Sequence, residues 1–183
     1  MIAVDKLPES DAPEILASTP YLELVQRRNW SFARRPQSLK VVAIVAVTNE
    51  QKLLLVEQFR IPVDGRVIEL PAGIAGDTGD PNESLQTAAQ RELIEETGYR
   101  AEAWRELATV TSSAGMTNEQ VTVFLATGLQ KISEGGGVDD EQITVHELPL
   151  EDLEGWLKNQ AADGKMIDSR VYAAIHWTRN CDC

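Results

Sequence analysis

Residues 80–99, with the sequence DPNESLQTAAQRELIEETGY, form the stretch around which the rest of the chain is organised. The pattern predicts one helix in which Asp80 is the N-cap, Pro81 takes the first helical position and Glu83 completes a capping box. Gly98 is expected to end the helix, because glycine adopts the left-handed backbone conformation without steric penalty.

Two carboxylates lie on the apolar side of this predicted helix. A rotation of about 100° per residue places Glu92 and Glu96 on the same stripe as Leu85 and Ala89, with Glu95 at its border. Buried carboxylates are unfavourable unless they are paired or metal-bound, and two of them one turn apart repel each other. A divalent cation removes both penalties, and hard oxygen ligands favour Mg²⁺ or Mn²⁺. Charge count alone favours the alternative of a solvated acidic face.

The motif that begins at Glu83 resembles the Nudix box. Seven residues separate Glu83 from the run RELIEETGY, which extends from Arg91 to Tyr99. The usual box has a glycine six residues before its first glutamate, where this chain has Asp77. The glycine that resembles the family's is Gly73 in the segment ELPAG, so the intervening loop is longer than the common form. Glu83 lies across the predicted helix from the carboxylate stripe and within reach of Arg91, so its expected role is structural.

The resemblance implies a metal site on this helix. The ligands it implies are Glu92, Glu96 and the carbonyl of Ala72, with help from Glu95 and Glu141. The cofactor would be Mg²⁺ or Mn²⁺, which neutralises phosphate charge and lowers the pKa of a bound water.

The glycine-rich, acidic stretch SEGGGVDDEQ, residues 133–142, predicts either a mobile loop that carries catalytic carboxylates or an acidic surface loop. In the family, a glutamate of the corresponding loop completes the metal site or acts as the base. Alignment on the strand that begins at Ile143 places Glu141 at the metal-linked position and Asp139 near the base position. The expected catalytic residues are therefore Glu141, Asp139 and Glu95.

The segments EQFR and VIELPAG resemble the ADP-ribose pyrophosphatase branch of the family. They contain Arg60, which would pair with a phosphate, and Glu69, which would accept hydrogen bonds from a ribose or from Arg60. An ordinary ion pair at the edge of a strand is the alternative interpretation.

Four further substrate-binding candidates are Trp30, Arg35, Gly115 and Glu119. Trp30 is suited either to core or dimer packing or to stacking on a nucleobase, and Arg35 either binds substrate or lies in a solvated turn. The stretch SSAGMTNE, residues 112–119, resembles the branch's serine-proline-glycine loop, with alanine in place of proline. In that loop Gly115 lets substrate approach the backbone and Glu119 orients it.

The composition limits the possible partners and location. With 183 residues, 43% of them apolar, the chain is expected to form one sizeable core, and its net charge of −12 argues against nucleic acids and anionic membranes. Because the chain has no apolar run long enough to cross a bilayer and no signal-peptide pattern, a cytoplasmic location is expected. Cys181 and Cys183 are too few for a disulfide framework or a zinc site.

The expected fold is α/β of the Nudix type, with a mixed β-sheet sandwiched between α-helices and an N-terminal β-hairpin extension. Residues 1–39 are expected to form a dimer-forming extension and residues 40–183 the Nudix hydrolase domain. Strands are expected at 21–25, 29–33, 40–47, 53–59, 106–111, 121–127 and 143–148, and further helices at 151–160 and 169–178. We also expect a loose lead-in before about residue 18, a hairpin formed by 40–47 and 53–59, and a cap by Ser169 on the last helix.

The resemblance implies metal-dependent hydrolysis of the pyrophosphate bond of a nucleoside diphosphate sugar. ADP-ribose is the first choice, giving AMP and ribose 5-phosphate, and the enzyme is expected to be a homodimer. GDP-mannose, another nucleotide sugar, a nucleoside triphosphate or a dinucleoside polyphosphate are the alternative substrates. An alternative from another class is a Nudix-fold module that senses ADP-ribose without cleaving it, although the complete set of glutamates favours the enzyme.

Overall fold

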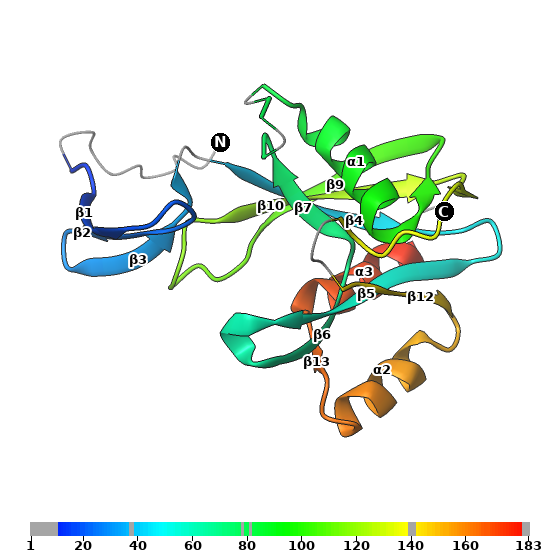
Figure 1. Cartoon of the computed structure of the whole chain (residues 1–183). Helices are drawn as coiled ribbons and strands as arrows, with labels where there is room; N and C mark the ends of the chain where they lie inside the picture. The colour runs from blue at the N-terminus through cyan, green and yellow to red at the C-terminus, as the bar shows by residue number, and fades with distance from the viewer. Residues whose placement is uncertain (1–10, 37–38, 78, 81, 139–141, 181–183) are drawn as a thin grey trace. The chain divides into compact units, whose positions relative to one another are not determined.

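The computed structural model describes residues 11–36, 39–77, 79–80, 82–138 and 142–180 (Figure 1). The chain divides into two compact units, each described here by itself. The N-terminal unit comprises Met1–Leu39 and Thr111–Gln120, and the main unit comprises Lys40–Val110 and Val121–Cys183. None of the helices within the described ranges is long and apolar enough to cross a lipid bilayer.

The N-terminal unit contains a three-stranded antiparallel sheet in the order β1-β2-β3. Its strands are β1 (Glu14–Ser18), β2 (Glu23–Arg27) and β3 (Trp30–Arg34). The two predicted strands are confirmed with shifted ends, whereas β1 lies in a stretch predicted to be a loose lead-in. Every residue of β1 is exposed, so this strand lacks the buried face that gives a strand its sequence signal.

Two four-stranded sheets form most of the main unit. The first has the order β7-β4-β10-β9 and the second has the order β12-β5-β6-β13. The strands of the first sheet are β4 (Lys40–Ala46), β7 (Ala72–Ala75), β9 (Ala103–Thr111) and β10 (Gln120–Thr127). Those of the second are β5 (Lys52–Arg60), β6 (Gly65–Glu69), β12 (Thr144–Pro149) and β13 (Met166–Ile167). A short pair consists of β8 (Tyr99–Arg100) and β11 (Gln130–Lys131), and one 3-10 turn, η2, spans Ile61–Val63.

The predicted hairpin of β4 and β5 is wrong, because the two strands enter different sheets after a single bridge between Val47 and Leu53. Both strands are apolar on both faces, so each takes partners on its two edges. β4 pairs with β7 and with β10, and β5 pairs with β6 and with β12. Adjacency in sequence and strong β-propensity did not reveal this separation.

Helices cover both faces of β4. On one face, Val42 and Ile44 belong to the core cluster that includes residues of α1 (Leu85–Thr97). On the other face, Val41 and Ala43 share a core cluster with residues of α2 (Leu153–Ala162) and α3 (Ser169–Asn180). The predicted arrangement of mixed sheets between α-helices is thus confirmed.

Helix α1 begins later than predicted. Ser84 is its N-cap, and the Ser84 side chain accepts a hydrogen bond from the Thr87 backbone at 3.0 Å. Asp80 instead forms a local turn in which its side chain accepts from the backbone of Asn82 at 2.9 Å, and Pro81 lies outside the described residues. The predicted end is confirmed, since Gly98 adopts a φ of 77° at the C-cap.

The last helix is capped by Asp168 and not by Ser169 as predicted. Ser169 is already helical, and an Asp168 oxygen accepts from the backbone N–H of Arg170 at 2.8 Å. Arg170 also donates two side-chain hydrogen bonds to the Asp168 carboxylate. Several adjacent residues suit a cap equally well, so the sequence alone did not identify the one that is used.

A buried carboxylate joins three strands of the second sheet. Glu57 of β5 is 5% exposed, and its oxygens lie 2.8 Å from Lys165 Nζ, 2.9 Å from His146 Nε2 and 3.4 Å from Arg66 Nη1. Burial alone would raise the pKa of Glu57, but the hydrogen bonds from Lys165 and His146 outweigh it, so this pKa lies below its usual value. His146 also lies against Trp156, with ring centroids 4.9 Å apart.

We expect Glu57→Gln to lower the free energy of unfolding at pH 7 by about 2 kcal/mol, because hydrogen bonds from charged donors to a buried carboxylate are lost. A carboxylate whose folded-state pKa is depressed contributes stability above its unfolded-state pKa of 4.5, and this contribution disappears as the pH falls through the folded-state pKa. The difference from wild type should therefore shrink between pH 7 and pH values well below 4.5 in urea denaturation.

Glu154→Gln is the matched control, because Glu154 pairs with Arg179 at an exposed position where both side chains are at least half exposed. Its effect should stay within about 1 kcal/mol. A Glu57→Gln deficit that is the same at both pH values would contradict the assignment of this stability to the ionised carboxylate.

Candidate active site

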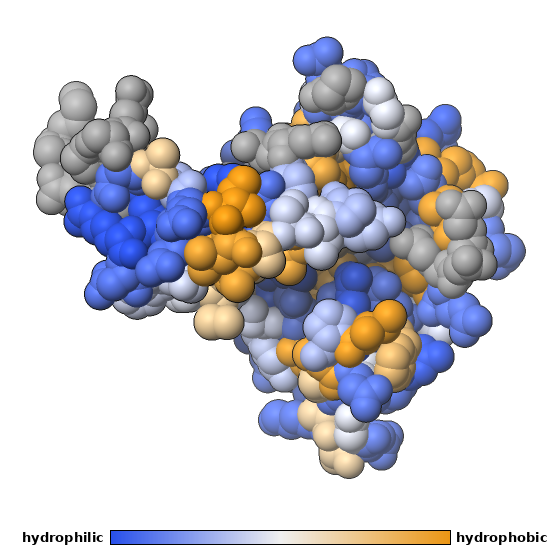
Figure 2. Space-filling view, turned by 60° about the vertical axis from the view of Figure 1, so that its left-hand side comes forward, coloured by the Kyte–Doolittle hydropathy of each residue, from blue (hydrophilic) through white to orange (hydrophobic). Residues whose placement is uncertain are grey.

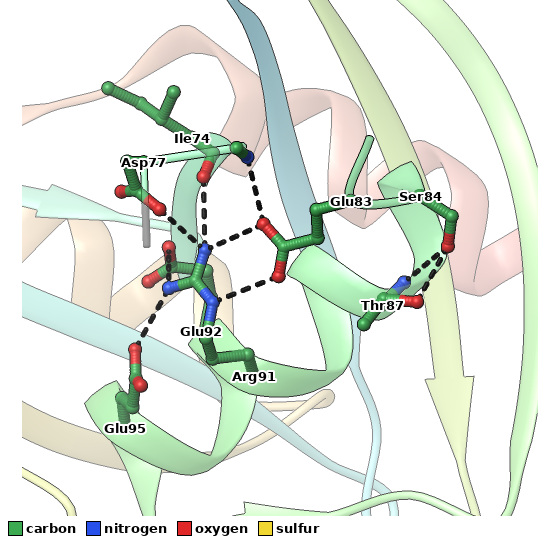
Figure 3. Close-up of polar contacts among 9 residues, drawn as sticks. Ile74, Asp77, Glu83, Ser84, Thr87, Arg91, Glu92 and Glu95 are labelled. Atoms are coloured by element: carbon green, nitrogen blue, oxygen red, sulfur yellow. Dashed lines mark hydrogen bonds and ion pairs between the residues drawn. The ribbon is translucent and has the colours of Figure 1, made fainter. Parts of the chain in front are cut away.

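Arg91 is the centre of a polar network on α1 (Figure 3). Its guanidinium donates hydrogen bonds of 2.7–3.3 Å to carboxylate oxygens of Asp77, Glu83, Glu92 and Glu95 and to the carbonyl oxygen of Ile74. The sequence indicated only the pairing with Glu83. Burial lowers the pKa of Arg91, but the hydrogen bond with Glu83 and the neighbouring carboxylates outweigh burial, so the net shift is upward. Arg91 therefore remains charged.

Glu83 fastens the loop before α1 to the helix. It lies outside the helix, so the predicted capping box is wrong. The predicted ion pair with Arg91 is confirmed at 3.1 Å, and the second Glu83 oxygen accepts from the backbone N–H of Gly76 at 2.9 Å. The hydrogen bond from Arg91 holds the pKa of Glu83 below its usual value despite burial. This glutamate therefore has a structural role.

Glu92 and Glu96 are both buried, as the phase of the helical stripe predicts, with exposed fractions of 8% and 4%. The Glu96 carboxylate accepts a hydrogen bond from the backbone N–H of Ala72 at 3.0 Å. Glu92 lies against Gly73, where an added Cβ would stand 1.9 Å from the Glu92 Cδ. The absence of a side chain at Gly73 is therefore what leaves space for the Glu92 carboxylate.

Burial raises the pKa of Glu92 to about 7, although the charge and hydrogen bond of Arg91 act in the opposite direction. A single guanidinium faces the carboxylates of Asp77, Glu83, Glu92 and Glu95. One positive charge does not balance four negative ones, so the site favours a second cation.

The donor set fits a hard divalent cation. Glu92 and Glu96 supply carboxylate oxygens from successive turns of α1, and Mg²⁺ is commonly held by one or two carboxylates together with waters and substrate phosphates. Within the described ranges, no group of three or more His, Cys, Asp or Glu side chains is arranged to hold a metal ion. The further ligands must therefore be backbone, water or phosphate oxygens or come from other residues. Asp139 and Glu141 lie outside the described residues.

Comparison with known proteins agrees with this geometry. The model of the NUDIX domain matches residues 38–173. The chain belongs to the Nudix family. The run from Glu83 to Tyr99 is thus the Nudix box, and Glu92 and Glu96 are two of its buried carboxylates.

Three relatives each match about seven tenths of the chain. The methanol dehydrogenase activator of Bacillus methanolicus is 34% identical over 74% of this chain and 70% of its own length. The ADP-ribose pyrophosphatase of Bacillus subtilis (strain 168) is 37% identical over 72% of this chain and 71% of its own length. The GDP-mannose pyrophosphatase of Enterobacter sp. (strain 638) is 34% identical over 69% of this chain and 68% of its own length.

A solved structure described as an ADP compounds hydrolase has the same fold. It superposes with a TM-score of 0.70 over 92% of this chain and 90% of its own, at 20% sequence identity. At this identity the likeness establishes the Nudix fold alone.

The structure brings four of the predicted substrate-binding residues together in the N-terminal unit. The Trp30 indole N–H donates to the Gly115 carbonyl at 3.1 Å, and Arg35 pairs with Glu119 at 2.7 Å. Next to them, the backbone N–H of Ala33 donates to the Met116 carbonyl. The loop that resembles the family's serine-proline-glycine loop is therefore attached to β3.

The other two substrate-binding candidates pair with each other in the main unit. Arg60 Nε donates to Glu69 at 2.9 Å, and the side chains are 44% and 7% exposed. This is the ion pair that the sequence allowed as an alternative, and the Arg60 side chain is still partly exposed.

Asp77 is the residue of the site that the sequence reasoning missed. It stands where the usual box has glycine, and its carboxylate accepts from Arg91 at 2.9 Å. The departure from the family pattern was visible in the sequence, but its pairing with a residue fourteen positions further on was not.

Proposed function

We propose that this Nudix protein hydrolyses the pyrophosphate bond of a nucleoside diphosphate sugar, with ADP-ribose as the first substrate and AMP and ribose 5-phosphate as the products. The observation that carries the proposal is the buried pair of carboxylates, Glu92 and Glu96, held beside Ala72 and Gly73 on the Nudix-box helix. The names of two relatives, ADP-ribose pyrophosphatase and GDP-mannose pyrophosphatase, support this class of substrate.

Mg²⁺ or Mn²⁺ is the proposed cofactor. Its proposed ligands are Glu92, Glu96 and the Ala72 carbonyl, with help from Glu95 and Glu141. A divalent ion supplies neutralisation of phosphate charge and makes water a better nucleophile at neutral pH.

The protein's own groups have distinct proposed roles in the reaction. Glu92 and Glu96 offer negative charge in a water-poor position, which favours binding of a cation with its phosphate partners over binding of either alone. A carboxylate of the 139–141 segment, Glu141 or Asp139, would accept the proton of the attacking water, with Glu95 as a further candidate. No covalent intermediate is required.

The paired candidates suggest how substrate is recognised. Glu69 orients the Arg60 guanidinium, which would pair with a substrate phosphate. Trp30 is 60% exposed while its N–H is anchored to Gly115, so its ring face is open to stacking on a base. Arg35 and Glu119, which pair with each other in the N-terminal unit, are the other two proposed substrate-binding residues.

A homodimer is part of the proposal. The N-terminal unit exposes several large apolar side chains, and Figure 2 shows apolar surface among hydrophilic side chains on the face in view. They are Ile15, Leu16, Tyr21, Leu22, Leu24 and Trp30, all at least 44% exposed. Sedimentation at micromolar concentration should give twice the mass of the 20.2 kDa chain.

The decisive experiment measures product release from a panel of phosphate esters, each with Mg²⁺, Mn²⁺ or EDTA. The panel contains ADP-ribose, GDP-mannose, UDP-glucose, NADH, diadenosine polyphosphates and nucleoside triphosphates. Metal-dependent cleavage of nucleotide sugars, with ADP-ribose at the highest kcat/KM, is the expected result. Higher kcat/KM for GDP-mannose would support the second candidate, which agrees with the name of the Enterobacter relative, GDP-mannose pyrophosphatase. Binding of ADP-ribose without turnover under any metal would identify a sensor.

Gly73→Ala is expected to reduce hydrolysis of ADP-ribose about 100-fold, because the new methyl group displaces the Glu92 carboxylate by more than an ångström. The overlap involves only the end of a flexible side chain, so the fold should persist in circular dichroism. Gly155→Ala in α2 is the matched control, since nothing lies within 4 Å of an added Cβ there. The control should keep full activity and gain slightly in stability, and full activity of Gly73→Ala would show that Glu92 need not occupy its position.

A further inference from the structure

The chain from Ile132 to Gly137 packs against the C-terminal turn of α1, and we call this segment the glycine latch. The amides of Ile132 and Ser133 donate to the Gly98 carbonyl at 2.8 and 3.1 Å. The amide of Gly136 donates to the Glu96 carbonyl at 2.9 Å, and the amide of Gly137 donates to the Glu95 carbonyl at 3.0 Å. The glycine latch therefore binds the backbone of the two residues whose side chains belong to the candidate site.

The contact is between backbones and leaves no room for side chains. A Cβ on Gly135 would stand 2.4 Å from the Thr97 carbonyl carbon and 2.6 Å from the Gly98 nitrogen. A Cβ on Gly98 would stand 2.1 Å from the Ser133 carbonyl oxygen. Both glycines also have positive φ angles, 68° and 77°, which other residues rarely adopt. The close approach thus depends on glycine on both sides.

The electrostatics of α1 explain why its last turn needs these donors. A helix C-terminus carries partial negative charge and is normally stabilised by a basic side chain. The last turn of α1 contains Glu95 and Glu96 and no basic residue. The N–H groups of Gly136 and Gly137 bring partial positive charge next to the carbonyl oxygens of Glu96 and Glu95, where the helix end is most negative.

We propose that Gly135 is a positioning residue for the metal-binding carboxylates, because it allows the glycine latch to hold the last turn of α1 with Glu96 against Ala72. This inference rests on the proposed function, since it assigns Glu92 and Glu96 to a divalent cation. A latch that is pushed away from α1 loses the two amide donors, and the Glu96 carboxylate then loses its fixed position relative to Glu92.

The test compares three glycines that all have positive φ. Gly135→Ala adds both backbone strain and a collision with α1, whereas Gly164→Ala adds strain at a φ of 87° with nothing within 4 Å. Gly136→Ala adds strain at a φ of 105°. The added Cβ would make only an ordinary van der Waals contact, with the Ile143 oxygen at 3.8 Å. All three substitutions add strain at a positive φ, and only the Cβ added at Gly135 would collide with α1.

Two readouts are measured on the full chain. In Mn²⁺ titrations followed by electron paramagnetic resonance without substrate, Gly135→Ala should bind at least tenfold more weakly than wild type, and Gly164→Ala within twofold of it. In hydrolysis of ADP-ribose, the Mg²⁺ concentration for half-maximal rate should rise by the same factor, while KM at saturating Mg²⁺ stays within twofold. A merely destabilised protein would lose active fraction without this shift in metal dependence.

Amide hydrogen exchange of the wild type covers the case in which Gly135→Ala does not fold. The amides of Gly136 and Gly137 should exchange at least 100-fold more slowly than in an open loop, and more slowly still with Mg²⁺. Unprotected amides, or Mn²⁺ affinity in Gly135→Ala equal to that of wild type, would overturn the positioning role. If wild type itself neither binds Mn²⁺ nor cleaves any nucleotide sugar, the proposed function fails instead, and the inference that rests on it fails with it.

Discussion

Glu92→Gln should abolish turnover and at the same time make the protein more stable in EDTA. The loss of activity should reach at least about 1,000-fold, the scale of losing one preorganised charge that acts on the transition state. The gain in stability arises because burial raises the pKa of Glu92 to about 7. A neutral amide of nearly the same volume avoids the unfavourable burial of charge.

The pH dependence of this gain has a definite sign. Below pH 4.5 the carboxyl group is protonated in both the folded and the unfolded protein and has no differential effect. Between pH 4.5 and about 7 only the unfolded chain ionises, so wild type loses stability relative to the variant as the pH rises. Above pH 7 the difference should level off at up to about 3 kcal/mol.

Thermal unfolding in EDTA at pH 4.5 and pH 8 measures this gain, and addition of Mg²⁺ should reverse the order by stabilising wild type alone. Ser84→Ala is a useful comparison, since it removes the N-cap of the same helix at an exposed position and should destabilise by about 1 kcal/mol at both pH values. A Glu92→Gln variant that is less stable than wild type at pH 8 in EDTA would show that Arg91 compensates the buried charge fully.

Arg91→Met should be the most destabilising single change in the site. Methionine retains most of the aliphatic volume but removes the hydrogen bonds that Arg91 donates to the carboxylates of Glu83, Glu92 and Glu95 and to the Ile74 carbonyl. Removal of one partner from a buried charge network typically costs 3–5 kcal/mol. Urea denaturation at pH 7 measures the loss of unfolding free energy. The Arg91→Lys variant should recover little of it, because an ammonium group lacks the planar set of donors with which a guanidinium binds several acceptors.

Arg179→Met is the control for the removal of an arginine from a helix. Arg179 pairs with Glu154 at 2.6 Å, but the side chains are 63% and 50% exposed. Its loss should change the free energy of unfolding by no more than about 1 kcal/mol. If Arg91→Met and Arg179→Met lowered the free energy of unfolding equally, the network around Arg91 would contribute no more to stability than an exposed ion pair.

Helix α1 was the most predictable part of the chain, because helical periodicity relates burial directly to position. Glu92 and Glu96 share a face with Ala88 and Ala89, and all four are buried. The start of that helix was not predictable from local preference. Asp80 and Ser84 are both good caps, and the choice between them depends on Glu83, whose partners Gly76 and Arg91 come from other parts of the chain.

Long-range pairing accounts for the other differences. The strands β4 and β5 enter different sheets because most of their pairing partners lie later in the sequence. Strand β1 was not predicted because none of its residues is buried. The glycines of residues 135–137 suggested either a mobile or an acidic surface loop, and the sequence did not indicate that Gly135 packs closely on α1 or that the amides of Gly136 and Gly137 donate to its last turn. A glycine-rich sequence indicates that unusual backbone conformations are possible. It does not indicate which neighbouring segment packs so closely that a side chain is excluded.

The anchoring of Glu83 has a consequence for changes of chain length before helix α1. Gly76 and Glu83 are joined by a hydrogen bond, and Arg91 binds Glu83 to the helix, so the two points from which the intervening chain leaves and returns are fixed. Residues can be added to such a loop at a cost of only about 0.6 kcal/mol for each doubling of its length. We therefore expect insertions between Gly76 and Glu83 to leave helix α1 undisturbed, although this point lies only a few residues from the buried carboxylates of Glu92 and Glu96.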